Sequence, residues 1–514
     1  MKVGTDKKIK RLATLANISQ KLRSAGQKIV LCHGVFDLVH PGHIKHFQSA
    51  KRHGDILIVT ITADKYVNKG PGRPIFVQQL RAEVLAAIEI IDYVAIVNSP
   101  SSIDAIEAVK PDFYIKGPDY KNRKPQKTIP TKLQEEKSTV EKHGGKLIYT
   151  DDEIVFSSSK LISEYLDVYP KKTKNYLDAF KKKYTSEMII GQFEKMSDIK
   201  ALVIGDAIID QYHYALPIGK SSKEPVLVHQ YIYSESYIGG VLATANHIAA
   251  LSKHVSLVTL LGKQKSFKNF IIRKLRPEVT AKFYFQSRGS TIIKRRFLDV
   301  NTKQKLFQIS YMKDEFILPE KTEAQVLEFL DHEIPRHDLI VVNDFGHNIM
   351  TDAIIRLICR KANFLALNVQ TNSANFGFNI VTKYPRADYI CIDDQEIRLA
   401  THDKHGNLQM LIRKIYQRMR CRLVVVTKGP NGSLAYTKEN GFYESPALTD
   451  KIVDRVGAGD ALFAITAPCV YAGLPPEEVV LIGNVAGALK VQIMGNKSQI
   501  ELVDMVKFIN RLLK

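Results

Sequence analysis

The stretch KIVLCHGVFDLVHPGHIKHF, Lys28–Phe47, opens with an apolar, β-branched run and ends in a helical pattern. The run predicts a buried strand, and the Pro-Gly step after it predicts a turn. Apolar or small residues at Ile44, Phe47 and Ala50 then predict a helix that ends near Gly54. Because the next run, DILIVTITAD, predicts a second strand, the segment forms a right-handed strand–helix–strand crossover on a parallel sheet.

Two histidines, His40 and His43, stand at the start of the predicted helix, just after the carboxyl end of the first strand. Ligands of parallel sheets bind at this edge, where helix N-termini offer free N–H groups to anions. Three interpretations are open. The imidazoles satisfy local hydrogen bonds only, or His43 and His46 on one helix face bind zinc, or two ring N–H donors stabilise a phosphoryl transition state.

Further motifs follow HPGH in a fixed order. They are GRPIFVQQLRAEVLAAIEIIDYV (Gly72–Val94), KPDFYIKGPDY (Lys110–Tyr120) and FSSSKLI (Phe156–Ile162). With the histidines, they resemble the HxGH nucleotidylyltransferase superfamily, in the form found in cytidylyltransferases and in the nucleotidyl-transfer half of bifunctional ADP-heptose synthase. The resemblance implies a Rossmann-like domain that binds ATP or CTP, with Mg²⁺, and joins the NMP unit to a sugar or polyol phosphate with release of pyrophosphate.

The same resemblance assigns roles to single residues. It implies that His40 and His43 contact the nucleotide phosphates and stabilise the pentacoordinate α-phosphorus, and that Lys45 binds phosphate. Because a triphosphate and a sugar phosphate bring several negative charges together, cations and N–H donors are expected here on charge alone. The other residues that the resemblance implies around the nucleotide are Phe36, Asp37, Arg81, Lys116, Ser157, Ser158 and Ser159.

Length and composition describe a soluble protein of several domains. The 514 residues are too many for one compact core, so two or three domains are expected. The absence of a long apolar run and of a secretory N-terminus predicts a cytoplasmic protein without a membrane span. The five cysteines show neither metal-ligand nor disulfide-framework spacing, so reduced core thiols are expected.

The net charge of +21 raises a different hypothesis, a nucleic-acid-binding scaffold. Salt-sensitive binding to duplex or single strands would support it. However, no nucleic-acid-binding motif is present, and the basic residues are spread along the chain. We therefore expect anionic small-molecule substrates and no nucleic-acid partner.

One basic run, KKTKNYLDAFKKK (Lys171–Lys183), marks a boundary. The predicted organisation is a nucleotidyltransferase domain over residues 1–168, a basic helical linker over 169–197 and a second domain over 198–514. In the second domain, the runs ALVIGD, VSLVTLLG, HDLIVVND, ANFLALNV, ADYICID and CRLVVVTKG alternate with helical patterns. The expected fold class is therefore α/β, with two doubly wound domains and a mostly parallel sheet in the second.

Near the end of the second domain stands DRVGAGDALFAI, Asp454–Ile465. Its glycines allow the backbone to approach a phosphate, and the following helix directs N–H groups at it. Asp460 stands where a carboxylate could take a proton from a hydroxyl nucleophile. By itself, GAGD is equally compatible with an ordinary glycine-rich helix start.

Together with GDAIIDQYHY, YIGGVLATANHIAALS and VVVTKGPNGSLAY, this motif resembles the PfkB/ribokinase family of sugar kinases, above all the heptose kinase half of bifunctional ADP-heptose synthase. The segment STIIKRRFLDVNTKQKLFQIS resembles the strand pair that forms a small β lid over the sugar and often makes the contact of a homodimer. The resemblance implies that Asp210, Gly239, Gly240 and Asn246 bind the sugar, that Gly457, Ala458 and Gly459 form the anion hole, and that Asp460 is the base.

The second domain also departs from the family pattern. Val456 replaces a threonine, and three family motifs, Asn-x-x-Glu, DPKG and DY-x-KG, read DDQE, NVQT and DFGHN. Glu396 of DDQE is the one expected metal ligand. The usual bifunctional enzyme also places its kinase half first. Two hypotheses follow: a bifunctional enzyme, or an active nucleotidyltransferase whose kinase-like half only binds or dimerises. The sugar and the choice between ATP and CTP stay open.

Overall fold

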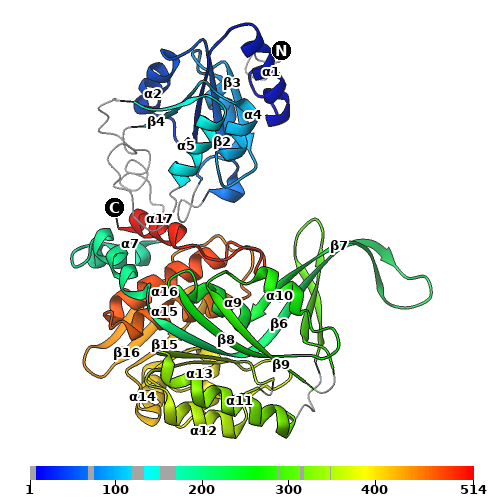
Figure 1. The fold of residues 1–514 in the computed structure, drawn as a ribbon, viewed down its shortest axis with the longest axis vertical. Helices are drawn as coiled ribbons and strands as arrows, with labels where there is room; N and C mark the ends of the chain where they lie inside the picture. Colours follow the sequence, from blue (N-terminus) through cyan, green and yellow to red (C-terminus); the bar gives the residue numbers. More distant parts are fainter. Residues whose placement is uncertain are drawn as a thin grey trace. The chain divides into compact units, whose positions relative to one another are not determined.

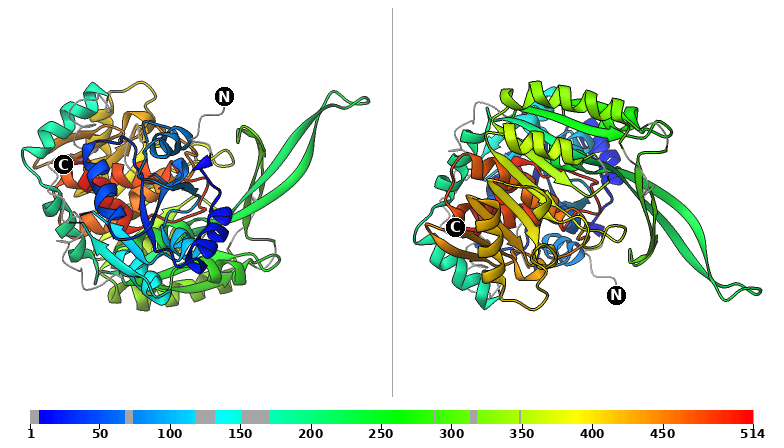
Figure 2. Two further views of the ribbon diagram at one scale, coloured as in Figure 1. Left: turned by 90° about the horizontal axis from the view of Figure 1, so that it is seen from above. Right: turned by 90° about the horizontal axis from the view of Figure 1, so that it is seen from below.

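The computed structural model describes residues 7–67, 74–117, 132–150, 170–286, 289–312, 318–347 and 349–513. By its contacts the chain divides into two compact units, residues 1–170 and 171–513. Figure 1 shows both units, and Figure 2 gives two further views. Each unit is an α/β fold, as predicted.

The first unit contains a five-stranded sheet in the order β3-β2-β1-β4-β5, with every neighbouring pair parallel. The order reverses between β1 and β4, which is where ligands of such sheets bind. Its elements are α1 (Leu12–Ser24), β1 (Ile29–Gly34), α2 (Pro41–Lys51), β2 (Ile56–Thr62), α3 (Gln78–Ala86), β3 (Tyr93–Val97), α4 (Ile103–Val109), β4 (Phe113–Lys116), α5 (Lys132–Lys142) and β5 (Lys146–Tyr149).

Side-chain alternation along the strands divides the first unit's core between the two faces of its sheet. On β1, Val30 and Cys32 pack with residues of α2 and α3, whereas Ile29 and Leu31 pack with residues of α1, α4 and α5. Successive residues of a strand point to opposite faces, so an uninterrupted apolar run requires helices on both. The apolar stretch that begins at Lys28 is therefore a doubly covered strand, as its sequence predicted.

The second unit is built on a twelve-stranded sheet in which β6 is shared by two parts. The first part of β6 lies between β8 and β12 in a parallel sheet that continues through β13, β14 and β15. The strands are β6 (Lys200–Lys220), β7 (Leu227–Gly240), β8 (His254–Leu261), β9 (Val279–Phe285), β10 (Ile292–Asp299), β11 (Lys305–Tyr311), β12 (Leu339–Asp344), β13 (Leu365–Val369), β14 (Tyr389–Asp393), β15 (Leu423–Thr427), β16 (Ser433–Thr437) and β17 (Gly441–Ser445).

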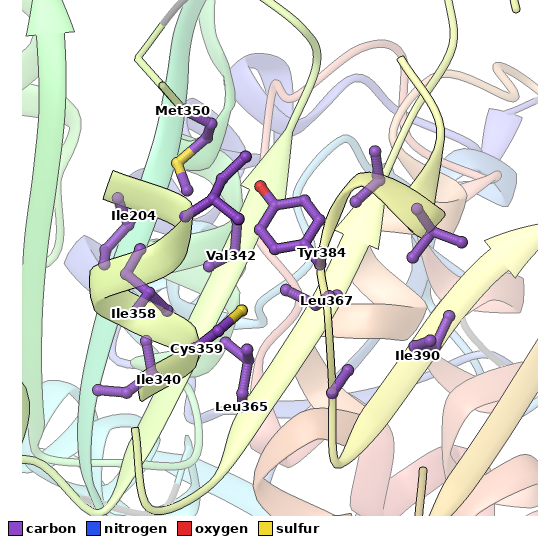
Figure 3. Close-up of a cluster of buried hydrophobic side chains, with 14 of the residues drawn as sticks. Ile204, Ile340, Val342, Met350, Ile358, Cys359, Leu365, Leu367, Tyr384 and Ile390 are labelled. Carbon is purple, nitrogen blue, oxygen red and sulfur yellow. The ribbon is translucent and has the colours of Figure 1, made fainter. Parts of the chain in front are cut away.

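Helices cover both faces of this sheet. Helices α11 to α14 pack on one face over a large apolar cluster, part of which is drawn in Figure 3 with Ile204, Val342 and Leu367 among its strand residues. Helices α9, α15 and α16 contact one another or the sheet on the other side. The helices are α9 (Val241–Ile248), α10 (Lys268–Lys274), α11 (Glu320–Glu333), α12 (Asp352–Lys361), α13 (Asp394–Thr401), α14 (Leu408–Met419), α15 (Ala458–Tyr471), α16 (Pro476–Lys490) and α17 (Leu502–Leu512).

The later part of β6 leaves this sheet and pairs with β7 and β10, and β10 pairs with β11. This four-stranded lid contains its own buried cluster of Tyr212, Tyr214, Tyr237 and Leu298. The far ends of β6 and β7 project from the rest of the unit as a two-stranded arm (Figures 1 and 2). The β10–β11 pair matches the strand pair expected from the sequence, whereas the long β6–β7 arm was not predicted.

The segment interpreted from sequence as a linker is, from Lys171 onward, part of the second unit by its contacts. It contains α7 (Lys171–Lys181) and α8 (Ser186–Gln192), and α8 contacts α17. Lys183 forms an ion pair with Glu477 at 2.9 Å. The apolar side chains that the segment buries are Leu177, Phe180, Ile189, Phe193 and Met196.

We therefore predict that residues 1–170 and residues 171–514 fold as separate soluble polypeptides, whereas residues 198–514 do not. The shorter fragment loses five buried apolar side chains, each contributing roughly 1.5–3 kcal/mol, which together match the net stability of an ordinary domain. Circular dichroism and urea unfolding of the three fragments would check this. A fragment of residues 198–514 as stable as 171–514 would show that the segment is a linker only.

Candidate functional site

The N-terminus of α2 holds both motif histidines in a reciprocal capping arrangement. Nδ1 of His40 accepts a hydrogen bond from the backbone N–H of Gly42 at 3.1 Å, and Nδ1 of His43 accepts one from the N–H of His40 at 3.4 Å. Backbone N–H groups can only donate, so in each neutral ring the proton lies on Nε2. Burial lowers the pKa of His40, which keeps its ring neutral at pH 7. Two Nε2–H donors are thereby fixed at a helix N-terminus.

The ring of Phe36 packs against the ring of His43. Its backbone lies in the left-handed region with φ of 47°, and its buried ring meets His43 edge-on at 5.3 Å between centroids. A side chain at Gly34 would come within 3.0 Å of that ring, so the ring needs a glycine there. Phe36, predicted from the family to shape the nucleotide pocket, acts in this structure as the packing partner that orients His43.

Asp37 and Arg81 join the segments around this site. Asp37 is buried, and its Oδ1 accepts the N–H groups of Ile75 and Phe76. Arg81 is 1% exposed; its guanidinium donates to the carbonyls of Phe76 and Thr62 and to the carboxylate of Asp64. It also donates to the carbonyl of Val35, in the loop that leads to the histidines. The guanidinium of Arg81, which the family resemblance assigned to phosphate binding, thus donates hydrogen bonds to four oxygens of the protein itself.

We predict that Arg81→Met lowers the stability of the first unit by about 3–5 kcal/mol, because breaking a buried ionic network leaves its partners uncompensated. Urea unfolding of residues 1–170 would measure the loss. Arg52→Met, at an exposed position after α2, is the matched control and should change stability little. Unchanged stability together with a raised KM for the nucleotide would instead assign Arg81 to phosphate binding.

The other predicted cations differ in their surroundings. Lys116, at the end of β4, is buried and forms an ion pair with Glu136 at 2.9 Å. Lys45 is exposed on α2. Nδ1 of His46 lies 3.3 Å from the hydroxyl of Thr150, and within the described ranges no group of three His, Cys, Asp or Glu side chains could hold a metal ion, so nothing there supports the zinc hypothesis. Ser157, Ser158 and Ser159 lie outside the described residues.

In the second unit, Asp460 lies in the first turn of α15 and is held by two amides. Its Oδ1 accepts from Nδ2 of Asn343, at the end of β12, at 3.2 Å, and from Nε2 of Gln370, after β13, at 2.6 Å. Burial raises the pKa of Asp460, whereas these two donors and the nearby Lys294 lower it. One carboxylate oxygen is therefore fixed by the protein, and the other can accept a proton from a hydroxyl group.

The glycine turn before Asp460 opens helix α15. Gly457 is the N-cap of α15 with φ of 78°, in the region that favours glycine. Ala458 and Gly459 follow as the first residues of the helix, and a side chain at Gly459 would meet no atom within 4 Å. The turn and the first turn of α15 thus leave backbone N–H groups available for an anion.

The predicted sugar residues Asp210, Gly239 and Gly240 meet at the base of the lid. Asp210 is 4% exposed and forms an ion pair with Arg296 of β10. A side chain at Gly239 would collide with the Asp210 carboxylate at 2.2 Å, and one at Gly240, whose φ is 57°, with the carbonyl of Asp206 at 2.4 Å. Burial lowers the pKa of Lys294 of β10, and Asp210 and Asp460 favour its charged form. Lys294 was not identified from the sequence.

Asn246 has another role in this structure. Its Nδ2 donates to the carbonyl of Lys274, and its Oδ1 accepts from the N–H of Arg276, both at 2.9 Å. The amide therefore uses both polar atoms to fix the turn after α10. These two bonds leave one N–H of the amide and one lone pair of its oxygen, so the sugar contact that the resemblance implies for Asn246 stays a prediction.

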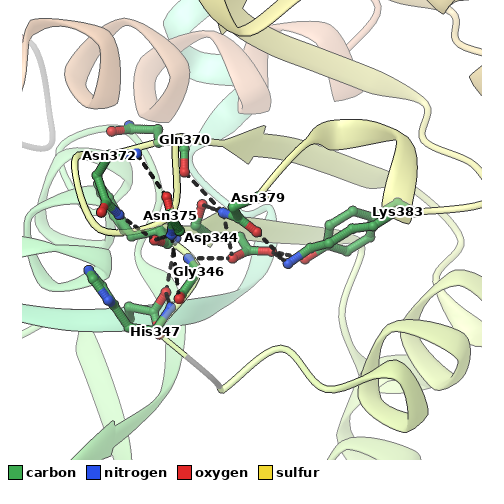
Figure 4. A network of polar contacts seen from close by, with 11 residues as sticks. Asp344, Gly346, His347, Gln370, Asn372, Asn375, Asn379 and Lys383 are labelled. Atoms are coloured by element: carbon green, nitrogen blue, oxygen red, sulfur yellow. Dashed lines mark hydrogen bonds and ion pairs between the residues drawn. The ribbon is translucent and has the colours of Figure 1, made fainter. Parts of the chain in front are cut away.

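Residues 344–347 of DFGHN and Gln370 of NVQT belong to one hydrogen-bonded unit with three asparagines that follow, shown in Figure 4. The Nδ2 atoms of Asn372 and Asn375 both donate to the carbonyl of Phe345 at 2.8 Å. Nδ2 of Asn379 donates to the carbonyls of Asp344 and Gln370 at 3.1 and 3.0 Å. The loop after β13 is thus fixed onto the end of β12, and the two altered motifs depend on each other.

Two buried carboxylates, Asp344 and Asp206, are hydrogen-bonded to residues of this unit. Asp344 accepts from Tyr384 and pairs with Lys383, each at 2.6 Å, and Asp206 accepts the N–H groups of Phe345 and His347. Burial and the nearby Asp344 raise the pKa of Asp206. Burial and Lys294 lower the pKa of His347 to about 4, so this ring is neutral at pH 7, where the family motif has a lysine.

Glu396 forms a capping box with Asp393 at the start of α13, in which each side chain accepts the other's backbone N–H. Burial and Asp393 raise the pKa of Glu396 to about 8. The part of the chain that the structure describes holds no cluster of acidic or histidine ligands sufficient for a metal ion. A Mg²⁺ ion here would need oxygen ligands from nucleotide phosphates and water, as Mg²⁺ commonly takes.

Comparison with known proteins identifies the second unit. Residues 198–501 match the family described as pfkB family carbohydrate kinase, over more than half of the chain. The protein belongs to this family. Residues 31–164 match the cytidylyltransferase-like family, so the cytidylyltransferase-like domain precedes the pfkB domain.

The curated relatives that the chain resembles carry the name bifunctional protein HldE. The bifunctional protein HldE of Syntrophotalea carbinolica is 34% identical over 166 residues, 32% of each chain, and that of Nitratiruptor sp. is 42% identical over 124 residues, 24% of this chain and 27% of the relative. The chain thus spans about a third or less of the curated relatives it matches. Phosphofructokinase-2 from Escherichia coli in complex with potassium has a TM-score of 0.51 and 15% identity, covering 62% of this chain and 100% of that chain, which confirms the ribokinase-like fold of the second unit.

Proposed function

We propose that the chain is a bifunctional enzyme of nucleotide-activated sugar synthesis. The first unit transfers an NMP group from ATP or CTP to a sugar or polyol phosphate, and the second unit phosphorylates the sugar beforehand. The bifunctional HldE relatives support the combination of the two activities, and the pfkB family supports the kinase. His40 follows the carboxyl end of β1, and Asn343 and Gln370 lie at the carboxyl ends of β12 and β13, the edge of a parallel sheet at which anionic ligands commonly bind.

One observation carries the first half of the proposal, the pair of imidazoles whose Nδ1 atoms are both occupied by backbone N–H groups. An oxygen of the sugar phosphate attacks the α-phosphorus in line, and pyrophosphate leaves. We expect the Nε2–H groups of His40 and His43 to donate to the oxygens on which negative charge builds. The free N–H groups of α2 act in the same direction.

In the second unit, a sugar hydroxyl would attack the γ-phosphate of ATP. Asp460 accepts the hydroxyl proton on its second oxygen while Asn343 and Gln370 hold the first. The glycine turn and α15 bind the transferred phosphate through N–H groups. Asp210, fixed by Arg296, would accept hydrogen bonds from sugar hydroxyls at the base of the lid. Mg²⁺ would neutralise the nucleotide phosphates in both reactions.

The test is a screen of the four NTPs against a panel of sugars, sugar phosphates and polyol phosphates. Pyrophosphate release reports the first unit, and ADP formation with an unphosphorylated sugar reports the second. We expect pyrophosphate release with one sugar phosphate. We also expect ADP formation when ATP is supplied with the corresponding unphosphorylated sugar. If no sugar in the panel led to ADP formation while calorimetry detected sugar binding, the second unit would be a binding module.

We propose that the protein works in the cytoplasm, which supplies nucleotide triphosphates and keeps thiols reduced. All five cysteines are buried and free, in agreement with this location. Among the described residues, no helix is both long and apolar enough to cross a bilayer.

We also propose that the outer face of the lid forms a homodimer contact. Rings of Tyr231, His213, Phe297 and Phe307 follow one another across β7, β6, β10 and β11, with centroid distances of 5.7, 5.2 and 4.5 Å between neighbours. Tyr231 and Phe307 are each more than half exposed. A continuous apolar stripe of this kind is typical of an interaction surface, and a second copy offers the same stripe.

Light scattering is expected to give twice the chain mass of 58.0 kDa for the natural protein and the chain mass for Phe307→Asp. A charge in the centre of an apolar contact cannot be hydrated and is unpaired. Met410→Asp, at an exposed position on α14, is the matched control and should stay dimeric. A monomeric natural protein at micromolar concentration would refute the contact.

A further inference from the structure

Lys490 is a buried cation that the proposed chemistry has not used. It is the last residue of α16, it is 0% exposed, and the rest of that helix is predominantly apolar. Burying an ammonium group costs several kcal/mol unless hydrogen bonds and opposite charges compensate it. A lysine at this position therefore has specific partners.

Those partners are two backbone carbonyls next to the glycine turn. Nζ of Lys490 donates to the carbonyl of Val456 at 2.9 Å and to that of Gly495 at 2.7 Å. The carboxylate of Asp454, itself 3% exposed, accepts the N–H groups of the same two residues, at 3.1 Å from Val456 and 2.9 Å from Gly495. A cation and an anion thus hold the two peptide segments together, one through their carbonyls and the other through their N–H groups.

This arrangement, which we call the 456–495 clamp (Lys490, Asp454, Val456 and Gly495), lies directly at the glycine turn. Val456 precedes Gly457, and a side chain at Gly457 would come within 3.3 Å of the Lys490 side chain. Burial lowers the pKa of Lys490 to about 8, while Asp454, Asp460 and Asp210 favour its charged form. The ammonium group is thus near the carboxylates and the turn to which phosphates would bind.

The clamp also reaches the lid. Asp454 accepts from the hydroxyl of Tyr212 on β6 at 2.7 Å and pairs with Lys305 at the start of β11 at 2.5 Å. Because β6 and β11 belong to the lid, one buried carboxylate fixes both the lid base and the turn. The clamp therefore sets the position of the turn relative to the sugar residues on β6.

We propose that Lys490 is a positioning residue for phosphoryl transfer: its ammonium group holds the glycine turn in the phosphate-binding conformation and supplies the counter-charge beneath it. The inference rests on the proposed kinase function of the second unit. It assigns to a side chain of α16 a positive charge near the site, in a chain that has Gln370 and His347 where the family motifs DPKG and DY-x-KG have lysines. It requires that the effect of Lys490 appears in kcat more than in KM, since the turn acts on the phosphate being transferred.

The test uses the full chain with Lys490→Met, which keeps the apolar stem and removes the charge. We expect kcat for ADP formation to fall on the order of tenfold to a hundredfold, and ammonium ions to restore part of it, because NH₄⁺ can bind the two vacated carbonyls. Lys507→Met, on the exposed side of α17, is the matched control and should keep the natural rate with or without ammonium. Natural kcat in Lys490→Met, or loss that ammonium does not restore in a folded protein, would overturn the proposal.

A second readout separates this inference from the proposed function. If the natural protein converts ATP to ADP with none of the sugars, the kinase proposal fails. Amide hydrogen exchange over residues 456–460 then tests whether Lys490 holds the glycine turn. Faster exchange in Lys490→Met that slows again with ammonium supports the clamp. Exchange equal to that of the natural protein overturns it.

Discussion

Replacing His43 by alanine is expected to lower pyrophosphate release by a hundredfold or more while the first unit stays folded. Loss of one preorganised transition-state donor typically costs about two to three orders of magnitude. Here the substitution removes the Nε2–H donor and also the Nδ1 that accepts the N–H of His40. Both imidazoles of the pair are therefore affected, and the loss should appear mainly in kcat.

His53→Ala is the matched control for this variant. His53 follows the same helix at its opposite end and is exposed. Its replacement should leave pyrophosphate release unchanged. Circular dichroism should give the same spectrum for both variants. If folded His43→Ala released pyrophosphate at the natural rate, the histidine pair would not be the transfer site.

Asp460→Asn is expected to lower ADP formation by two to four orders of magnitude, the usual contribution of a general base. The asparagine side-chain oxygen can still accept from Asn343 and Gln370, so the site keeps its geometry. The amide nitrogen takes the place of the second carboxylate oxygen and cannot accept the hydroxyl proton. Sugar and nucleotide binding, measured by calorimetry, should change little.

The control here is Asp198→Asn. Asp198 precedes β6 at the amino end of the sheet, opposite the site, and its side chain is 86% exposed. This variant should keep the natural rate of ADP formation. Equal rates for Asp460→Asn and the natural protein would exclude Asp460 as the base, and a loss of sugar binding in step with rate would give it a binding role.

The strands were predictable because burial on both faces leaves a simple signal. Each apolar run identified in the second half, from ALVIGD to CRLVVVTKG, is a strand of the sheet. The β6–β7 arm was missed because its residues combine exposed apolar and polar side chains without the alternation of a half-buried strand. The arm stays extended because β6 and β7 pair with each other along its whole length, and not because its side chains are buried.

Individual roles were harder to predict than positions. Arg81 and Asn246 occupy plausible places in their motifs, but their hydrogen-bond partners come from segments that the motifs do not include. Lys490 left a signal that could have been used, a single cation at the end of a largely apolar helix. Its partners Val456 and Gly495 lie on two separate loops, which no spacing in the sequence could have related.

The structure gives the departures from the family pattern contacts that the sequence alone did not predict. Taken singly, Gln370 removes a cation and His347 replaces a lysine. In the structure, Gln370 holds Asp460, and the asparagines after it fasten the loop to the end of β12. Nε2 of His347 and Oδ1 of Asn343, in contrast, are buried without a hydrogen-bond partner, so the altered site is only partly bonded within the protein.

The most direct test of the first unit's assignment is pyrophosphate release by the 514-residue chain. Each NTP would be paired with each member of a panel of sugar and polyol phosphates, with His43→Ala beside the natural protein. We predict release with ATP or CTP and at least one phosphate acceptor, and its loss in His43→Ala. Absence of release with every pair, from folded protein that binds nucleotide, would contradict the assignment of the first unit as a nucleotidyltransferase.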